Sequence, residues 1–307
     1  MSAWTWRYFL FWNIGTFVFS NPRNMKKFVK IVAWTILGLV ILLFGAGSLM
    51  FYKVKNGFPV SYETEKPTIS FPDSIPAILV FSKTTGFRHA ESIETSKPIF
   101  GDIAKKRGWF LHETEEGGVF NGEQLAKFKV VVFNNTTGRL LDETQQAALQ
   151  AFVENGGTIL GIHGAGDDSH HWPWYEANLI GAEFSHHPLN PQFQRTAVIR
   201  DAGTDITLAQ GLPAQWNSSD EWYVFFKQPK DAKILFHIQG DKILPSGNML
   251  WMTDKNFGMG KFHPVAWQKS VGKGRSFYTS MGHSKEVWGH PEFVRMIENA
   301  IEWGIKN

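Results

Sequence analysis

The sequence of 307 residues is 43% hydrophobic and 19% charged, with a formal net charge of +3. This composition is typical of a globular protein with a sizeable core. Basic and acidic side chains nearly balance after residue 52, so the body offers no clustered basic surface for nucleic acid. The absence of cysteine excludes disulfides, thiolate metal sites and cysteine nucleophiles.

An uncharged apolar stretch occupies residues 31–52. It is long enough for a transmembrane helix, which needs about 20 apolar residues, and it lacks the polar stripe of a core helix. The small residues at 45–48 are followed by further apolar ones, which favours an uncleaved signal anchor over a cleaved signal peptide. Basic residues before the span predict a single-pass protein of the cell inner membrane, with its domain on the periplasmic or extracellular side.

Residues 1–30 are expected to form a separate N-terminal segment. The aromatic-rich stretch 1–24 is followed by Met25 and two lysines, a conventional basic start for a signal anchor, so Met25 is a candidate initiator that N-terminal sequencing would test. In the longer form, residues 4–19 are expected in the membrane interface. Residues 53–76 contain four prolines and are predicted to be a linker that holds the domain off the membrane.

The body, residues 77–305, has the pattern of one α/β domain. Strands are predicted at 77–81, 110–112, 130–133, 158–162, 197–199, 223–226, 234–236, 249–252 and 277–279. Helices are expected up to about Lys106, from a capping box of Asp142 and Gln145, and over 291–305. Strands that alternate with helices at this spacing imply a parallel sheet covered on both faces.

Polar side chains stand where the predicted strands end, and in open α/β sheets ligands bind beyond the carboxyl ends of the strands. These side chains are Arg88, His89, Asn134, His163 and His283. The glycine-rich stretch around His163 resembles a nucleophile elbow, in which a strained turn presents one side chain. His163 is therefore a candidate base, acid or metal ligand, with an incidental histidine in a glycine-rich turn as the alternative.

Other polar and aromatic residues give weaker signals. The histidine pairs at 170–171 and 186–187 favour a structural or interfacial role, because adjacent residues on a helix point apart. Glu221 precedes a predicted strand and adds an acid. Trp222 and Trp267 are candidates for packing against sugar faces, although most tryptophans of this domain are expected in the core.

Five motifs, in this order, resemble those of the ThuA-like (trehalose-utilisation) family of the class I glutamine amidotransferase-like superfamily. They are GFRH at 86–89, GIHG at 161–164, DEWY at 220–223, HPVAW at 263–267 and GKGRSFYTSMGH at 272–283. The resemblance covers about residues 77–305 and implies a flavodoxin-like three-layer sandwich. His163 and His283 stand where amidotransferases have their cysteine and its partner histidine, so without cysteine, glutamine hydrolysis through a thioester is not possible.

The resemblance implies a function on trehalose or a related keto-sugar. In this hypothesis His163 is the general base and His283 the acid, His89 and Glu221 complete the catalytic group, and Arg88 clamps an anion or carbonyl. Further candidates for contact with the carbohydrate are Asn134, His263, Trp267 and Trp222.

Several alternatives remain open. Zinc held by two of the histidines and Glu221 is a variant of the enzyme hypothesis. A non-catalytic sugar- or partner-binding module, tethered to the membrane through residues 31–52, is the main alternative, and a structural interaction protein is a third. The sequence leaves homo-oligomerisation undecided.

Overall fold

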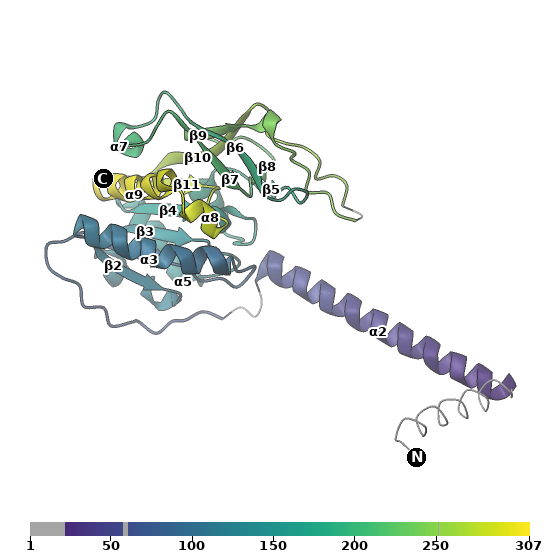
Figure 1. The fold of residues 1–307 in the computed structure, drawn as a ribbon. Helices are drawn as coiled ribbons and strands as arrows, with labels where there is room; N and C mark the ends of the chain where they lie inside the picture. The colour runs from purple at the N-terminus through teal and green to yellow at the C-terminus, as the bar shows by residue number, and fades with distance from the viewer. Residues whose placement is uncertain (1–21, 58–60, 251) are drawn as a thin grey trace, which may run out of the picture. The chain divides into compact units, whose positions relative to one another are not determined.

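The computed structural model describes residues 22–57, 61–250 and 252–307 (Figure 1). The chain divides into two units, Met1–Tyr52 and Lys53–Asn307. Helix α2 (Pro22–Asn56) is 35 residues long, and its apolar window has a mean hydropathy of 2.4. By length and composition this helix is able to cross a membrane. The predicted interfacial stretch 4–19 lies outside the described residues.

A nine-stranded sheet forms the centre of the second unit. Its strands are β1 (Ala77–Phe81), β2 (Phe110–Thr114), β3 (Phe128–Asn134), β4 (Thr158–Ile162), β6 (Gln194–Arg200), β7 (Gln215–Asp220), β9 (Lys233–Gln239), β10 (Phe262–Val271) and β11 (Gly274–Thr279). Their order is β2-β1-β3-β4-β11-β10-β9-β6-β7. The first five of these pair in parallel, and from β11 onward the pairing is antiparallel. A separate pair consists of β5 (Phe184–His186) and β8 (Val224–Phe225).

Helices cover both faces of this sheet (Figure 1). They are α3 (Ala90–Arg107), α4 (Gly122–Leu125), α5 (Glu143–Glu154), α6 (Pro173–Tyr175), α7 (Ile206–Ala209), α8 (Lys285–Trp288) and α9 (Pro291–Ile305). Shorter turns are η1 (Gly117–Val119), η2 (His163–Gly166), η3 (Glu176–Ile180) and η4 (Gly240–Lys242).

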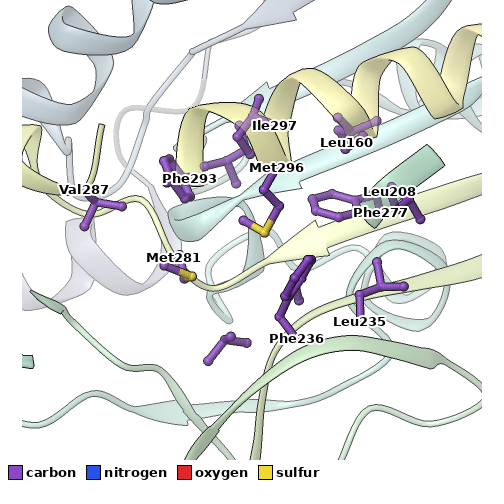
Figure 2. Close-up of a cluster of buried hydrophobic side chains, with 14 of the residues drawn as sticks. Leu160, Leu208, Leu235, Phe236, Phe277, Met281, Val287, Phe293, Met296 and Ile297 are labelled. Atoms are coloured by element: carbon purple, nitrogen blue, oxygen red, sulfur yellow. The ribbon is translucent and has the colours of Figure 1, made fainter. Parts of the chain in front are cut away.

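Two hydrophobic clusters lie on the two faces of the sheet, and successive side chains of β1 belong alternately to one and the other. Ile78 belongs to the cluster that includes α9, whereas Leu79 belongs to the cluster that includes α5. Figure 2 shows side chains of the first cluster, among them Met296 of α9 and Phe277 of β11. The fold is therefore a mixed α/β architecture with a buried sheet.

Several predicted elements are confirmed with their bounds: β1, β4 and α9. The predicted capping box is also present, with Asp142 Oδ1 accepting from the Gln145 backbone N–H at 2.8 Å and Gln145 Oε1 accepting from the Asp142 N–H at 3.0 Å. The prediction of a strand at 249–252 is wrong. The backbones of Met249 and Met252 bond to each other in an isolated bridge outside any strand, and Leu250 has a left-handed φ of 51°.

The segment predicted as a linker packs on the domain from residue 61 onward. Lys83 Nζ lies 2.5 Å from a carboxylate oxygen of Glu63. The ring of Phe71 contacts that of Phe128, with centroids 5.1 Å apart. Residues 61–76 are therefore part of the folded unit and do not form a free spacer.

Gly118 lets this segment approach the domain closely, and a side chain there is expected to displace it. A Cβ at Gly118 would overlap the backbone carbonyl of Glu65. Overpacking of this kind destabilises by about 1–3 kcal/mol. We expect Gly118→Ala to lower the Tm by several degrees and to make the bond after Glu65 accessible to a glutamate-specific protease. Gly122→Ala is the control, because its Cβ meets nothing within 4 Å; equal Tm values and cleavage rates for the two variants would contradict this account.

Candidate functional site

The four predicted catalytic side chains come together at one end of the strands. His163 directly follows β4, Glu221 directly follows β7, His283 lies just beyond β11, and His89 directly precedes α3. One nitrogen of each histidine and one oxygen of the carboxylate all lie within 4.8 Å of one another. We call these four residues the histidine–glutamate cluster.

His163 occupies a strained turn of the kind that the elbow-like sequence predicts. Its φ is 47°, in the left-handed region, and its side chain is fully buried. This backbone conformation costs a non-glycine residue about 1–2 kcal/mol. His163 Nδ1 lies 2.7 Å from the Ser280 carbonyl oxygen, and the Tyr278 hydroxyl donates to the His163 carbonyl at 3.0 Å. These contacts hold the imidazole with its Nε2 toward the other members of the cluster.

Glu221 is the hub of the cluster. Its Oε2 lies 3.0 Å from His283 Nδ1 and 3.4 Å from His163 Nε2. Its Oε1 lies 3.1 Å from His187 Nδ1 and accepts from Gln192 Nε2 at 2.5 Å. Burial by itself would raise the pKa of this carboxyl, but its close contacts with His163 and His283 outweigh burial and hold the pKa well below its usual range.

The other two histidines differ in environment. Burial would lower the pKa of His283, but the hydrogen bond and charge of Glu221 outweigh it and raise that pKa. For His89, burial and then the charges of His163 and His283 lower the pKa well below its ordinary value. His89 Nδ1 is buried and has no hydrogen-bond partner among the described residues. The cluster thus combines a cationic tendency at His283 with a neutral imidazole at His89.

Asp220 ties the end of β7 to the turn after β11. Its Oδ2 accepts from the Gly282 backbone N–H at 2.7 Å, and its Oδ1 accepts from the Glu221 N–H at 2.9 Å. Burial raises the pKa of Asp220. Through these bonds, Asp220 fixes the positions of Glu221 and His283 relative to each other.

Exposed aromatic rings border the cluster where it meets solvent. Phe87 is 49% exposed and its ring centroid lies 4.9 Å from that of His89. Phe193 is 43% exposed and its centroid lies 5.2 Å from that of His283. The side chains of His283 and His187 are 17% and 31% exposed, so solvent reaches the cluster on this side. We call Phe87 and Phe193 the aromatic rim.

Two predicted binding residues form their polar contacts with other side chains of the domain. Arg88 donates to both carboxylate oxygens of Glu115, at 2.9 and 2.7 Å, and this pairing raises the pKa of Arg88. Asn134 is fully buried and donates to the hydroxyls of Ser82 and Ser96 at 3.1 and 2.8 Å. Arg88 is thus held in an ion pair and Asn134 in an internal network, and neither position supports the predicted contact with substrate.

The remaining predicted binding residues pack in the core. His263 is fully buried with its Nε2 2.9 Å from the Tyr223 carbonyl oxygen, and burial lowers its pKa to about 4. Trp222 and Trp267 are also fully buried, and their indole N–H groups donate to backbone carbonyls at 2.7 and 2.6 Å. Their burial leaves these rings without access to a sugar, which corrects the prediction that they contact it.

Four residues of the site are not predicted from the sequence. His187 was expected to be structural or interfacial, whereas its contact is with the buried Glu221. Gln192 and Phe193 lie in the loop after β5, where no strand-end pattern marks them. Phe87 had a signal, because it stands between Gly86 and Arg88 in the first motif.

The fold and the cluster define a mixed α/β domain with a histidine-rich site at the strand ends. The family model of ThuA, described as trehalose utilisation, matches residues 77–304, and the chain belongs to this family. This confirms the resemblance drawn from the five motifs.

Two solved structures share the fold. A ThuA-like protein from Bacteroides uniformis is 22% identical with a TM-score of 0.60, covering 81% of this chain and 95% of its own. A ThuA-like protein from Parabacteroides merdae is 17% identical with a TM-score of 0.57, covering 75% of this chain and 90% of its own. No curated protein matches the chain.

Proposed function

We propose that the chain acts on a carbohydrate of the trehalose or keto-sugar type at the histidine–glutamate cluster. The observation that carries this proposal is the convergence of His89, His163, Glu221 and His283 beside an exposed aromatic rim. Imidazole and carboxylate groups exchange protons with hydroxyl and carbonyl groups near neutral pH. Exposed aromatic rings beside polar groups suit the apolar face of a sugar. The trehalose-utilisation family supports the choice of substrate class.

We further propose that α2 anchors the domain in a cell membrane, with the domain on the periplasmic side. The support is the length and hydropathy of α2 together with the basic residues that precede its apolar stretch. We also place the domain among flavodoxin-like three-layer sandwiches. The parallel strands β2-β1-β3-β4-β11 follow the order 2-1-3-4-5 of that fold.

The proposed sugar site predicts that the aromatic rim contributes to affinity. Phe87→Ala and Phe193→Ala are each expected to weaken trehalose binding about 2- to 12-fold, since an aromatic contact contributes about 0.5–1.5 kcal/mol. Calorimetry on the full-length protein in detergent measures this effect, with a keto-disaccharide as a second ligand.

A matched control is Phe262→Ala. Phe262 is an exposed phenylalanine that packs on His237, with centroids 4.3 Å apart, outside the cluster. Equal dissociation constants for the rim variants and this control would rule out the rim as a sugar contact. Sugar binding without turnover would favour the alternative of a non-catalytic sugar-binding module, and no sugar binding at all would favour a partner-binding module.

A further inference from the structure

We infer that His163, Glu221 and His283 bind one divalent transition-metal cation of the zinc class, with His89 beside its open coordination position. This inference deepens the proposed function and rests on it for the sugar that the cation would meet. The presence of the cation itself is a separate claim, because it depends only on the geometry of the cluster.

The three donor atoms are spaced as ligands of one ion. His163 Nε2 and His283 Nδ1 are 3.0 Å apart, and Glu221 Oε2 lies 3.0 Å from His283 Nδ1 and 3.4 Å from His163 Nε2. Nitrogen and oxygen ligands lie about 2.0–2.2 Å from zinc, so two ligands at a tetrahedral angle are about 3.3–3.6 Å apart. The triangle matches this spacing once the donors relax outward by a few tenths of an ångström.

Outer contacts orient the donors toward the centre of the triangle. His163 Nδ1 faces the Ser280 carbonyl, which requires the proton on Nδ1 and leaves the Nε2 lone pair directed into the cluster. Gln192 and His187 both engage Oε1 of Glu221, which leaves Oε2 for the ion. Histidine and carboxylate ligands of metals are held by such contacts in known sites.

Hydrogen bonds alone satisfy the cluster poorly. With the Nε2 lone pair of His163 and Oε2 of Glu221 both facing His283 Nδ1, the single proton on that nitrogen serves only one of them. His89 adds a buried Nδ1 without a hydrogen-bond partner among the described residues. An unsatisfied buried polar group costs about 1–3 kcal/mol. A bound cation would interact favourably with the three donor atoms of His163, His283 and Glu221 at the same time.

The coordination number indicates what the ion would do. Three protein ligands with an open position are typical of catalytic zinc sites, whereas structural sites are closed by four. The open position suits a carbonyl or hydroxyl oxygen of a sugar, which the cation would polarise as a Lewis acid. His163 and His283 then act as ligands, in place of the free base and acid that the sequence predicts.

The test is zinc binding to the full-length protein in detergent after removal of metal by a chelator. Calorimetry is expected to show one zinc ion per chain, and Co²⁺ should give the visible absorption of a tetrahedral site. His163→Ala, Glu221→Gln and His283→Ala are each expected to weaken zinc binding at least about 100-fold, beyond the 10- to 100-fold typical of outer contacts. Gln192→Ala keeps all three ligands and is expected to weaken it about 10-fold.

The control is His237→Ala, which removes a histidine paired to Asp201 at 2.9 Å outside the cluster. Wild-type zinc affinity in this variant supports the site, and equal affinities in all variants would overturn it. Zinc binding without trehalose binding would leave the metal site standing and remove the proposed function. Trehalose binding and turnover by metal-free protein that takes up no zinc would do the reverse.

Discussion

Replacement of His163 by asparagine is expected to lower turnover of a trehalose-type substrate by about 10²- to 10⁴-fold while the protein stays folded. The loss follows because the variant lacks the imidazole nitrogen that faces Glu221 and His283. The fold is expected to survive because asparagine adopts left-handed backbone readily, and residue 163 has a φ of 47°. Turnover and Tm measured on the same preparation separate the two effects.

The comparison variant is His290→Ala. His290 precedes α9 in a His-Pro-Glu triplet, and its side chain makes no capping hydrogen bond there. We expect this variant to turn over substrate at the wild-type rate. Turnover at the wild-type rate by His163→Asn would show that the reaction does not take place at the cluster. Slow turnover by His290→Ala would show that the His-Pro-Glu triplet takes part in it.

Removal of the carboxylate in Glu221→Ala is expected to cause a large loss of stability. Glu221 is 2% exposed and pairs with His163, His283 and His187. Loss of one partner from a buried charged network costs about 3–5 kcal/mol, and the ability of the imidazoles to become neutral places this case near the lower figure. For a domain of this size, the lower figure corresponds to a fall in Tm of roughly 6–12 °C.

Two further variants calibrate this result by thermal unfolding. Glu221→Gln keeps an oxygen that accepts from Gln192, so its Tm is expected between those of the wild type and Glu221→Ala. Glu115→Ala removes a half-exposed carboxylate paired to Arg88, and a pair of this kind contributes at most about 1 kcal/mol. A Glu221→Ala protein as stable as Glu115→Ala would show that the hub does not stabilise the fold.

The elements that follow local rules could be predicted from sequence. The five apolar residues of β1 and the capping box at Asp142 specify their own structure. Strand β7 could not be predicted in this way, because most of its residues are polar and resemble a loop. It is a strand because its backbone pairs with the antiparallel strand β6, and because its Trp216 side chain is buried in the core. That information is tertiary and leaves no local pattern.

The same distinction explains the outcome at the site. Carboxyl ends of neighbouring parallel strands meet at one edge of a sheet, so the sequence could point to His163 and His283. The supports of Glu221 come from the loop after β5, whose course is set by the whole fold. The predicted contact of Trp222 and Trp267 with a sugar is not supported, because sequence alone does not show which large rings are buried and which reach solvent.

The distribution of the cluster along the chain has a consequence for biogenesis. Its members lie at positions 89, 163, 221 and 283, and Asp220 joins the last two through the turn after β11. A chain that folds from its N-terminus during synthesis therefore completes the cluster only when the last strand, β11, and the turn after it have formed. If the proposed site is right, copies that lack this strand are expected to bind neither the cation nor the sugar.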